Sequence, residues 1–200
     1  MADAFSCTLA GIILAAGHGK RLASIAPKPL LTFHGKTFLQ LVIDHLSAIG
    51  VTQRIVVTNK DLYQSIVDFH PATQVFINPH PEMGMISSLW IGMAAIGPDV
   101  SGFFMCPIDY PLVQRETFRR LSAAHISNPH QIIIPTHNGR FGHPIIFSKD
   151  FFQALQHVPL DQGARFLIRR NQDRLFQVEV SDPGILININ TPELYHQYCK

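Results

Sequence analysis

Two glycines and two cations lie close together near the start of the chain. The segment LAAGHGKRLASIAPKPLL, residues 14–31, carries Gly17, Gly19, Arg21 and Lys28 directly after an apolar run. Because glycine has no side chain, backbone N–H groups beside it approach a phosphate closely, and nearby cations neutralise the phosphate's charge. The pattern predicts an anion-binding loop. A tight turn with two solvated cations is the alternative explanation of this segment alone.

Two common phosphate-binding motifs do not fit this loop. A dinucleotide-binding fingerprint requires glycine where Leu22 stands. A P-loop requires glycine at Leu14 and serine or threonine at Arg21. The segment therefore matches neither motif, and its chemistry has to be judged from the remaining residues.

An aspartate follows a second apolar run. In GFFMCPIDYPLV, residues 102–113, Asp109 lies between Pro107 and Pro111, which restrict the backbone and stop the strand from continuing. We expect its carboxylate at the rim of a sheet. There it either binds a metal ion or shapes a turn.

A third polar group precedes an expected helix. The segment PEMGMISSLWIGM, residues 81–93, places Gly84, Ser87 and Ser88 where hydroxyls and backbone N–H groups contact a ligand at a helix start. The methionines and leucine of the same segment keep helical spacing, which equally favours a core helix with Ser88 as its cap.

Two asparagines lie near the C-terminus. In GILININTPEL, residues 184–194, Asn188 and Asn190 precede a Thr-Pro pair that suits the start of a helix. Amide oxygens at these positions either complete a site for a hard cation or shape the turn into that helix.

These segments together resemble the motifs of MobA-like NTP transferases and sugar-phosphate nucleotidyltransferases. The resemblance implies that the first loop wraps a nucleoside triphosphate, that Arg21 contacts its β- and γ-phosphates and that Lys28 lies at the α-phosphate. The matching residues are Leu14, Ala15, Ala16, Gly17, Gly19 and Arg21, followed by Lys28, Pro29, Leu30 and Leu31.

The same resemblance assigns the other elements. It implies that Asp109 and Asn190 are ligands of Mg²⁺, with Asn190 replacing an aspartate of the commoner form. It also implies that Gly84, Ser87 and Ser88 lie near the nucleotide base.

One branch of the family, the molybdopterin cytidylyltransferases, has motifs similar to two further segments of this chain, NGRFGHPIIF and DQGARFLIR. Its R-x-G-H-P and D-x-G-A-R elements imply acceptor-binding roles for Arg140, His143, Asp161 and Arg165. The planar donors of arginine suit a phosphate. A structural role for His143, as a hydrogen-bonded residue before a strand, is the alternative that its polarity favours.

Apolar runs alternate with stretches of helical period, which predicts an α/β fold with a mostly parallel twisted sheet and helices on both faces. The resemblance implies the three-layer, Rossmann-related fold of nucleotide-diphospho-sugar transferases. We expect one domain over residues 1–200. Expected strands lie at 8–16, 54–59, 74–78, 102–107, 131–135, 143–147, 174–180 and 184–188, and expected helices at 36–50, 85–96, 161–170 and 191–200.

The composition narrows the class of protein. Lysine and arginine are scattered and the net charge is +2, so nucleic acid is not an expected partner. The three cysteines, Cys7, Cys106 and Cys199, have no disulfide or zinc spacing, which favours a reducing cytoplasm. The longest uncharged stretch, 83–98, is short and interrupted by glycines, so we expect no membrane span.

The sequence thus predicts a cytoplasmic, Mg²⁺-dependent nucleotidyltransferase that uses a nucleoside triphosphate and a phosphorylated acceptor. The resemblance favours transfer of CMP from CTP to molybdopterin or its molybdenum form, with a molybdoenzyme as a further partner. Two alternatives stay open: a sugar-1-phosphate nucleotidyltransferase, and a non-catalytic protein of the same fold that binds a nucleotide or delivers a cofactor.

Overall fold

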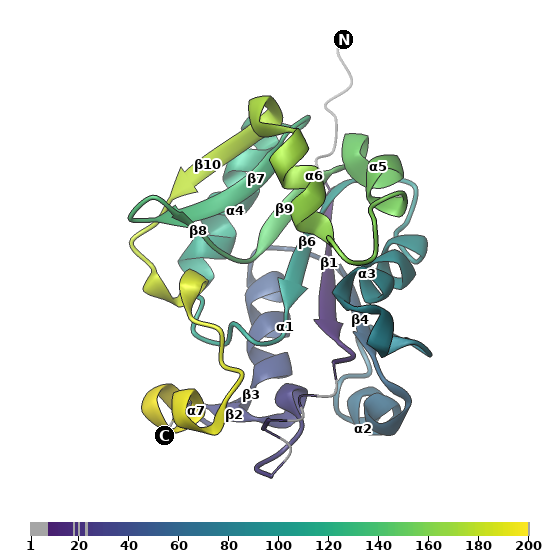
Figure 1. Ribbon diagram of the computed structural model, residues 1–200, viewed down its shortest axis with the longest axis vertical. Coiled ribbons are helices and arrows are strands. Elements are labelled where there is room, and N and C mark those ends of the chain that lie inside the picture. Colours follow the sequence, from purple (N-terminus) through teal and green to yellow (C-terminus); the bar gives the residue numbers. More distant parts are fainter. Residues whose placement is uncertain (1–7, 18, 20, 23, 200) are drawn as a thin grey trace.

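The computed structural model describes residues 8–17, 19, 21–22 and 24–199. Figure 1 shows a central sheet with helices on both faces, which confirms the expected α/β architecture. The sheet has the strand order β10-β7-β9-β6-β1-β4-β5, with β8 paired to β7. The strands are β1 (Thr8–Ala15), β4 (Gln53–Thr58), β5 (Gln74–Ile77), β6 (Val100–Pro107), β7 (Ile132–His137), β8 (Arg140–Phe141), β9 (Ile145–Ser148) and β10 (Leu175–Glu179).

The sheet is mostly parallel. Strand β1 pairs in parallel with β4 and β6, β4 with β5, and β7 with β10. Strand β9 runs antiparallel to both of its neighbours, β6 and β7. The carboxyl ends of β1, β4 and β6 therefore meet at one edge, where ligands bind in open α/β sheets.

Two layers of helices bury the two faces of the sheet, as two separate hydrophobic clusters show. One cluster takes side chains from α1 (Phe38–Ala48), α2 (Lys60–Phe69), α4 (Arg115–Ser127) and α7 (Pro192–Cys199). The other takes them from α3 (Met85–Ala94), α5 (Phe152–Gln156) and α6 (Ala164–Arg170).

Strand β1 shows why the sheet is buried on both sides. Its Leu9 and Ile13 belong to the first cluster, and Ile12 and Leu14 to the second, because successive side chains point to opposite faces. At Gly11 an added Cβ would lie 2.5 Å from Leu46 of α1, so the glycine allows the helix to pack closely.

Most expected elements are confirmed, with ends displaced by a few residues. The helix expected at 36–50 begins at Phe38, because Lys36 and Thr37 form strand β3 of a small hairpin with β2 (Thr32–Phe33). The Thr37 hydroxyl then caps α1 by accepting a hydrogen bond from the N–H of Gln40 at 3.1 Å.

The strand expected at 184–188 is wrong. Residues Pro183–Leu186 form a 3-10 turn, η5, and the segment pairs with no strand among the described residues. The turn begins at Asp182, whose carboxylate accepts a hydrogen bond from the N–H of Gly184 at 2.9 Å. The apolar run is buried by packing rather than by pairing, because Ile185 is fully buried in the first cluster.

Of the cysteines, Cys106 in β6 and Cys199 in α7 are free thiols, while Cys7 lies outside the described residues. So does His18, within the glycine loop. Across the part of the chain that the structure describes, every helix is too short or too polar to cross a bilayer.

Asp182 anchors the chain that leads to Asn188. Its carboxylate is 3% exposed and accepts hydrogen bonds from the backbone N–H of Gln114 at 2.8 Å and the hydroxyl of Thr117 at 2.6 Å, at the start of α4. With the contact to Gly184, three donors satisfy one buried carboxylate. This carboxylate ties η5 to α4.

Replacing this carboxylate is expected to destabilise the protein. Asp182→Ala removes the common acceptor of three buried donors, so the free energy of unfolding should fall by about 2–4 kcal/mol. Urea denaturation followed by circular dichroism measures the change. The control, Asp173→Ala, alters an exposed aspartate in a neighbouring turn and should change the free energy by less than about 0.5 kcal/mol. Equal effects would contradict the anchoring role.

Candidate active site

The glycine loop follows β1. Leu14, Ala15 and Ala16 are buried, and Gly17 and Gly19 come next. Gly19 has a φ of +55°, and an added Cβ there would lie 3.2 Å from Cγ of Lys28. Glycine is needed at this position because its backbone is left-handed and the Lys28 stem runs beside it.

Asn59 holds the start of the same loop. Its Nδ2 donates to the carbonyl oxygen of Ala16 at 3.3 Å, and its Oδ1 accepts from the N–H of Leu62, which caps α2. The exit of β1 is therefore tied to the exit of β4 and to the helix that follows it. The sequence analysis did not single out Asn59, although its place directly after an apolar strand was visible.

Lys28 reaches the end of β6. Lys28 stands between Pro27 and Pro29 and is the first residue of a short 3-10 turn, η1 (Lys28–Leu30). Its Nζ lies 3.2 Å from Oδ2 of Asp109. The two side chains are 16% and 20% exposed, so this ion pair is largely shielded from water. The contact brings together two of the residues that the family resemblance implies for one site.

The amide that meets Asp109 belongs to Asn188. Its Nδ2 donates to Oδ2 of Asp109 at 2.9 Å, and the N–H of Ile189 donates to the Asp109 carbonyl at 2.8 Å. Asn190, which the family resemblance implies as a metal ligand, makes no hydrogen bond to Asp109 among the described residues. The backbone bond of Ile189 holds this segment so that the Asn188 amide lies against the carboxylate.

The segment before α3 is organised by a buried amide. Asn78, 2% exposed, donates from Nδ2 to the hydroxyls of Ser87 and Ser88, each at 2.9 Å. The Ser87 hydroxyl also donates to the Gly84 carbonyl at 2.8 Å. Ser87 and Ser88 therefore both belong to a buried network, and Ser88, with Gly84, also lines a cleft.

Two clefts meet at Asp109. The glycine-loop cleft, about 330 Å³, and the His143 cleft, about 340 Å³, share Asp109, Met85 and Pro107. The glycine-loop cleft is also lined by Leu14, Ala16, Gly17, Gly19, Lys28, Pro81, Gly84, Ser88 and Ile108. The His143 cleft is also lined by Ile86, Leu89, Met105, Tyr110, His143, Ile145, Leu160, Asp161, Gln162, Gly163, Ala164, Arg165, Ile168 and Asn188.

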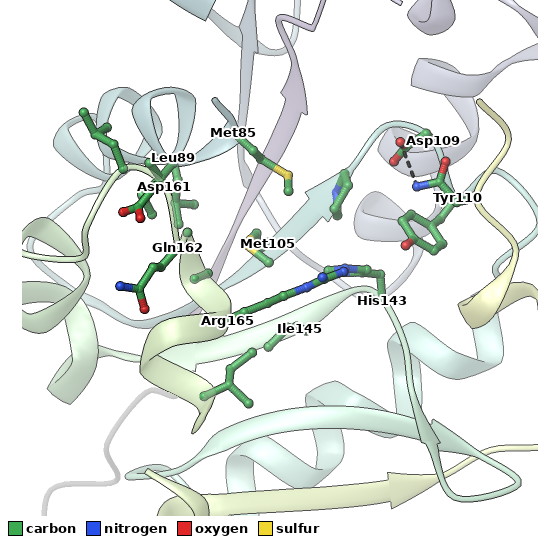
Figure 2. Close-up of a pocket in the computed structure, with 17 residues that line it drawn as sticks. Met85, Leu89, Met105, Asp109, Tyr110, His143, Ile145, Asp161, Gln162 and Arg165 are labelled. Carbon is green, nitrogen blue, oxygen red and sulfur yellow. Dashed lines mark hydrogen bonds between the residues drawn. The ribbon is translucent and has the colours of Figure 1, made fainter. Parts of the chain in front are cut away.

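Three of the four residues expected at an acceptor line the His143 cleft: His143, Asp161 and Arg165. In Figure 2 the Arg165 side chain extends from α6 toward His143. Arg140, in β8, is exposed and lines neither cleft, and the same is true of Arg21 on the glycine loop.

Tyr110 and the apolar floor of the His143 cleft belong to the site although no sequence motif marked them. Tyr110 directly follows Asp109 and is half-buried. Burial raises the pKa of Tyr110 above its ordinary value, against a smaller lowering by the Asn188 amide. The apolar floor includes Leu89, Met105 and Ile145.

The donor set at Asp109 suits a hard cation. Asn188 Oδ1 is buried and has no hydrogen-bond partner among the described residues, and it belongs to the amide that contacts the Asp109 carboxylate. Carboxylate and amide oxygens are ligands that Mg²⁺ and Mn²⁺ accept, and Mg²⁺ usually retains waters and substrate oxygens as well. No cluster of three histidine, cysteine or acidic side chains occurs in the described ranges.

A family model described as the MobA-like NTP transferase domain matches residues 11–175. The chain belongs to this family. It is 25% identical over 187 residues to the molybdenum cofactor cytidylyltransferase of Escherichia coli, covering 91% of each chain. It is 26% identical over 203 residues to the nicotine blue oxidoreductase of Paenarthrobacter nicotinovorans, covering 96% of this chain and 97% of the relative. These two relatives, which match more than nine-tenths of this chain, are thus named for different reactions.

A third relative, the bifunctional protein GlmU of Azorhizobium caulinodans, is 30% identical over 115 residues, or 56% of this chain. The match spans about a quarter of that longer protein. Among solved structures, Rv0371c from Mycobacterium tuberculosis H37Rv superposes with a TM-score of 0.81 at 24% identity, covering 96% of this chain and 98% of that one. A manganese complex of Rv0371c has a TM-score of 0.76, also at 24% identity, covering 96% and 97%.

The protonation of His143 gives a test of the site's electrostatics. Burial lowers the pKa of His143 to about 4; the Asp109 charge opposes this shift, and the Arg165 charge adds to it. A histidine whose pKa is lower in the folded state than in the unfolded state stabilises the fold above the unfolded pKa of about 6.5, and that contribution is lost as pH falls toward 4.

We therefore expect acid to destabilise the wild type more than His143→Gln. Between pH 7 and pH 4.5, the wild-type free energy of unfolding should fall by about 2–3 kcal/mol more than that of the variant. Urea titrations of both proteins at each pH measure this difference. His157→Gln, at an exposed histidine, is the control and should follow the wild type. A wild-type pH dependence equal to that of His143→Gln would contradict a buried neutral imidazole.

Proposed function

We propose that this protein is a nucleotidyltransferase that requires a divalent metal ion, Mg²⁺ in the cell, and transfers CMP from CTP to a phosphorylated acceptor with release of pyrophosphate. The proposed acceptor is molybdopterin or its molybdenum form. The observation that carries the proposal is the position of Asp109, which is shared by two clefts and contacts both Lys28 and Asn188.

The two clefts suit an in-line displacement. A phosphate oxygen of the acceptor, lying in the His143 cleft, attacks the α-phosphorus of the nucleotide. The bond between that phosphorus and the oxygen bridging to the β-phosphate breaks, and pyrophosphate leaves along the glycine loop. Such transfer depends mainly on positioning and on fixed charge.

The cations have distinct roles in this proposal. Lys28 lies beside Asp109 and neutralises charge at the α-phosphate, where the largely shielded position strengthens its effect. We assign Arg21, exposed on the glycine loop, to the β- and γ-phosphates. Asp109 and Asn188 would hold the metal ion, which supplies positive charge to the phosphate oxygens when bound.

The lining of the His143 cleft supports an acceptor that carries both a ring system and a phosphate. Leu89, Met105 and Ile145 present sulfur and methyl groups to this cleft, and the Arg165 guanidinium lies in it as well. The full-length similarity to a molybdenum cofactor cytidylyltransferase supports the same choice. The shorter similarity to GlmU keeps a sugar-1-phosphate acceptor as the second candidate. The Lys28 ammonium and the Asn188 amide, which converge on Asp109, favour catalysis over nucleotide binding alone.

A pyrophosphate-release screen tests the proposed reaction. The four nucleoside triphosphates are offered with Mg²⁺ and either molybdopterin or a set of sugar 1-phosphates. We expect release only with CTP and molybdopterin, and Asp109→Ala should reduce it by at least about 10³-fold while the protein stays folded, because a carboxylate at the rim contributes little to packing. Release with a sugar phosphate instead would establish the second candidate. Nucleotide binding without any release would establish a binding protein.

A matched pair of variants tests which asparagine serves the metal. Asn188→Ala should weaken Mn²⁺ binding by about tenfold or more, because it removes an oxygen donor and a hydrogen bond to the Asp109 carboxylate. Asn190→Ala is the control and should leave the affinity within about twofold. Electron paramagnetic resonance measures free Mn²⁺ with a non-hydrolysable CTP analogue present. A larger effect at Asn190 would instead support Asn190, the ligand that the family resemblance implies.

A further inference from the structure

Tyr110 lies between Asp109, which is proposed to bind the metal, and His143, which is proposed to bind the acceptor. It directly follows Asp109 in the chain and lines the His143 cleft. In Figure 2 its ring lies between Asp109 and His143. The centroids of the Tyr110 and His143 rings are 4.7 Å apart, and the rings are tilted by 51°. This distance and tilt fall within the favourable range for an aromatic pair.

The His143 imidazole depends on this packing for its orientation. Its backbone N–H donates to the carbonyl of Ile185 at 3.1 Å, which fixes the main chain. Its Nδ1 is buried and has no hydrogen-bond partner among the described residues. Ring nitrogens of histidine are usually oriented by a hydrogen bond. The structure does pack the His143 ring against Tyr110, a contact that limits how the imidazole can turn.

Arg165 lines the same cleft as Tyr110 and His143. Its side chain extends toward His143 in Figure 2, and its positive charge acts on both His143 and Tyr110. No carboxylate among the described residues forms an ion pair with Arg165. An arginine with unused donors beside a neutral imidazole offers charge and N–H groups to a phosphate.

We propose that Tyr110 is a positioning residue: its ring holds His143 so that the imidazole and the Arg165 guanidinium together grip the phosphate of the acceptor beside Asp109. This inference rests on the proposed function, and it adds a residue that sets acceptor affinity without touching the nucleotide. The ring is the part that acts, so phenylalanine should replace tyrosine and an aliphatic side chain should not.

Inorganic phosphate is the probe for binding by His143 and Arg165. It is titrated into the full-length protein at pH 7.5, and binding is followed by the NMR signals of the His143 imidazole. We expect Tyr110→Leu to weaken phosphate binding about fivefold or more, and Tyr110→Phe to stay within about twofold of the wild type. Tyr198→Leu, at a partly exposed tyrosine of α7, is the control and should leave phosphate binding unchanged.

A second measurement separates positioning from a general structural effect. The affinity for a non-hydrolysable CTP analogue with Mn²⁺ should fall much less in Tyr110→Leu than the phosphate affinity does, because Tyr110 lines the His143 cleft and not the glycine-loop cleft. The inference is overturned if phosphate leaves the wild-type His143 signals unmoved, if Tyr110→Leu binds phosphate as the wild type does, if Tyr110→Phe is as weak as Tyr110→Leu, or if nucleotide affinity falls equally.

The phosphate titration does not depend on turnover. If the wild type releases no pyrophosphate with any acceptor while phosphate binding follows Tyr110 as expected, the proposed function fails and the grip on phosphate stands. If pyrophosphate is released but the phosphate affinity is the same in the wild type and in Tyr110→Leu, the proposed function stands and the positioning role fails.

Discussion

The site depends on one carboxylate held between groups from distant parts of the chain. Asp109 contacts Lys28, 81 residues before it, and Asn188, 79 residues after it. A rim carboxylate with only one of these neighbours would be an ordinary feature of a strand end. Their convergence concentrates opposite charges in a partly shielded place, where electrostatic interactions are stronger than in water.

The fold brings these groups together by separate means. Parallel pairing of β1 with β6 puts the glycine loop and Asp109 at the same edge of the sheet. The Asp182 carboxylate ties the C-terminal segment to α4, and Ile189 then docks on the Asp109 carbonyl. These contacts fix the positions of Asp109, Lys28 and Asn188 relative to one another. Fixed charges of this kind are what the proposed reaction needs.

The sequence was informative where short motifs coincide with strand ends. Buried strands appear in the sequence as apolar runs. The residues that follow two of these runs, Gly17 and Asp109, lie at the edge of the sheet where the two clefts are found. Reasoning from the sequence failed where tertiary contacts decide. The apolar run after Gly184 looks like a strand but lacks a partner strand, because a buried aspartate starts a turn there. Spacing alone does not distinguish Asn188 from Asn190, and nothing in the sequence marks Tyr110, whose proposed role rests on packing against a ring 33 positions later.

The most direct test is a crystal structure with Mn²⁺ and a non-hydrolysable CTP analogue, using anomalous scattering to locate the metal. We expect one manganese ion about 2.0–2.3 Å from the Asp109 carboxylate, on the side of Asn188, with the triphosphate along the glycine loop and its α-phosphate near Lys28. Manganese bound elsewhere, or a nucleotide outside the glycine-loop cleft, would contradict the account.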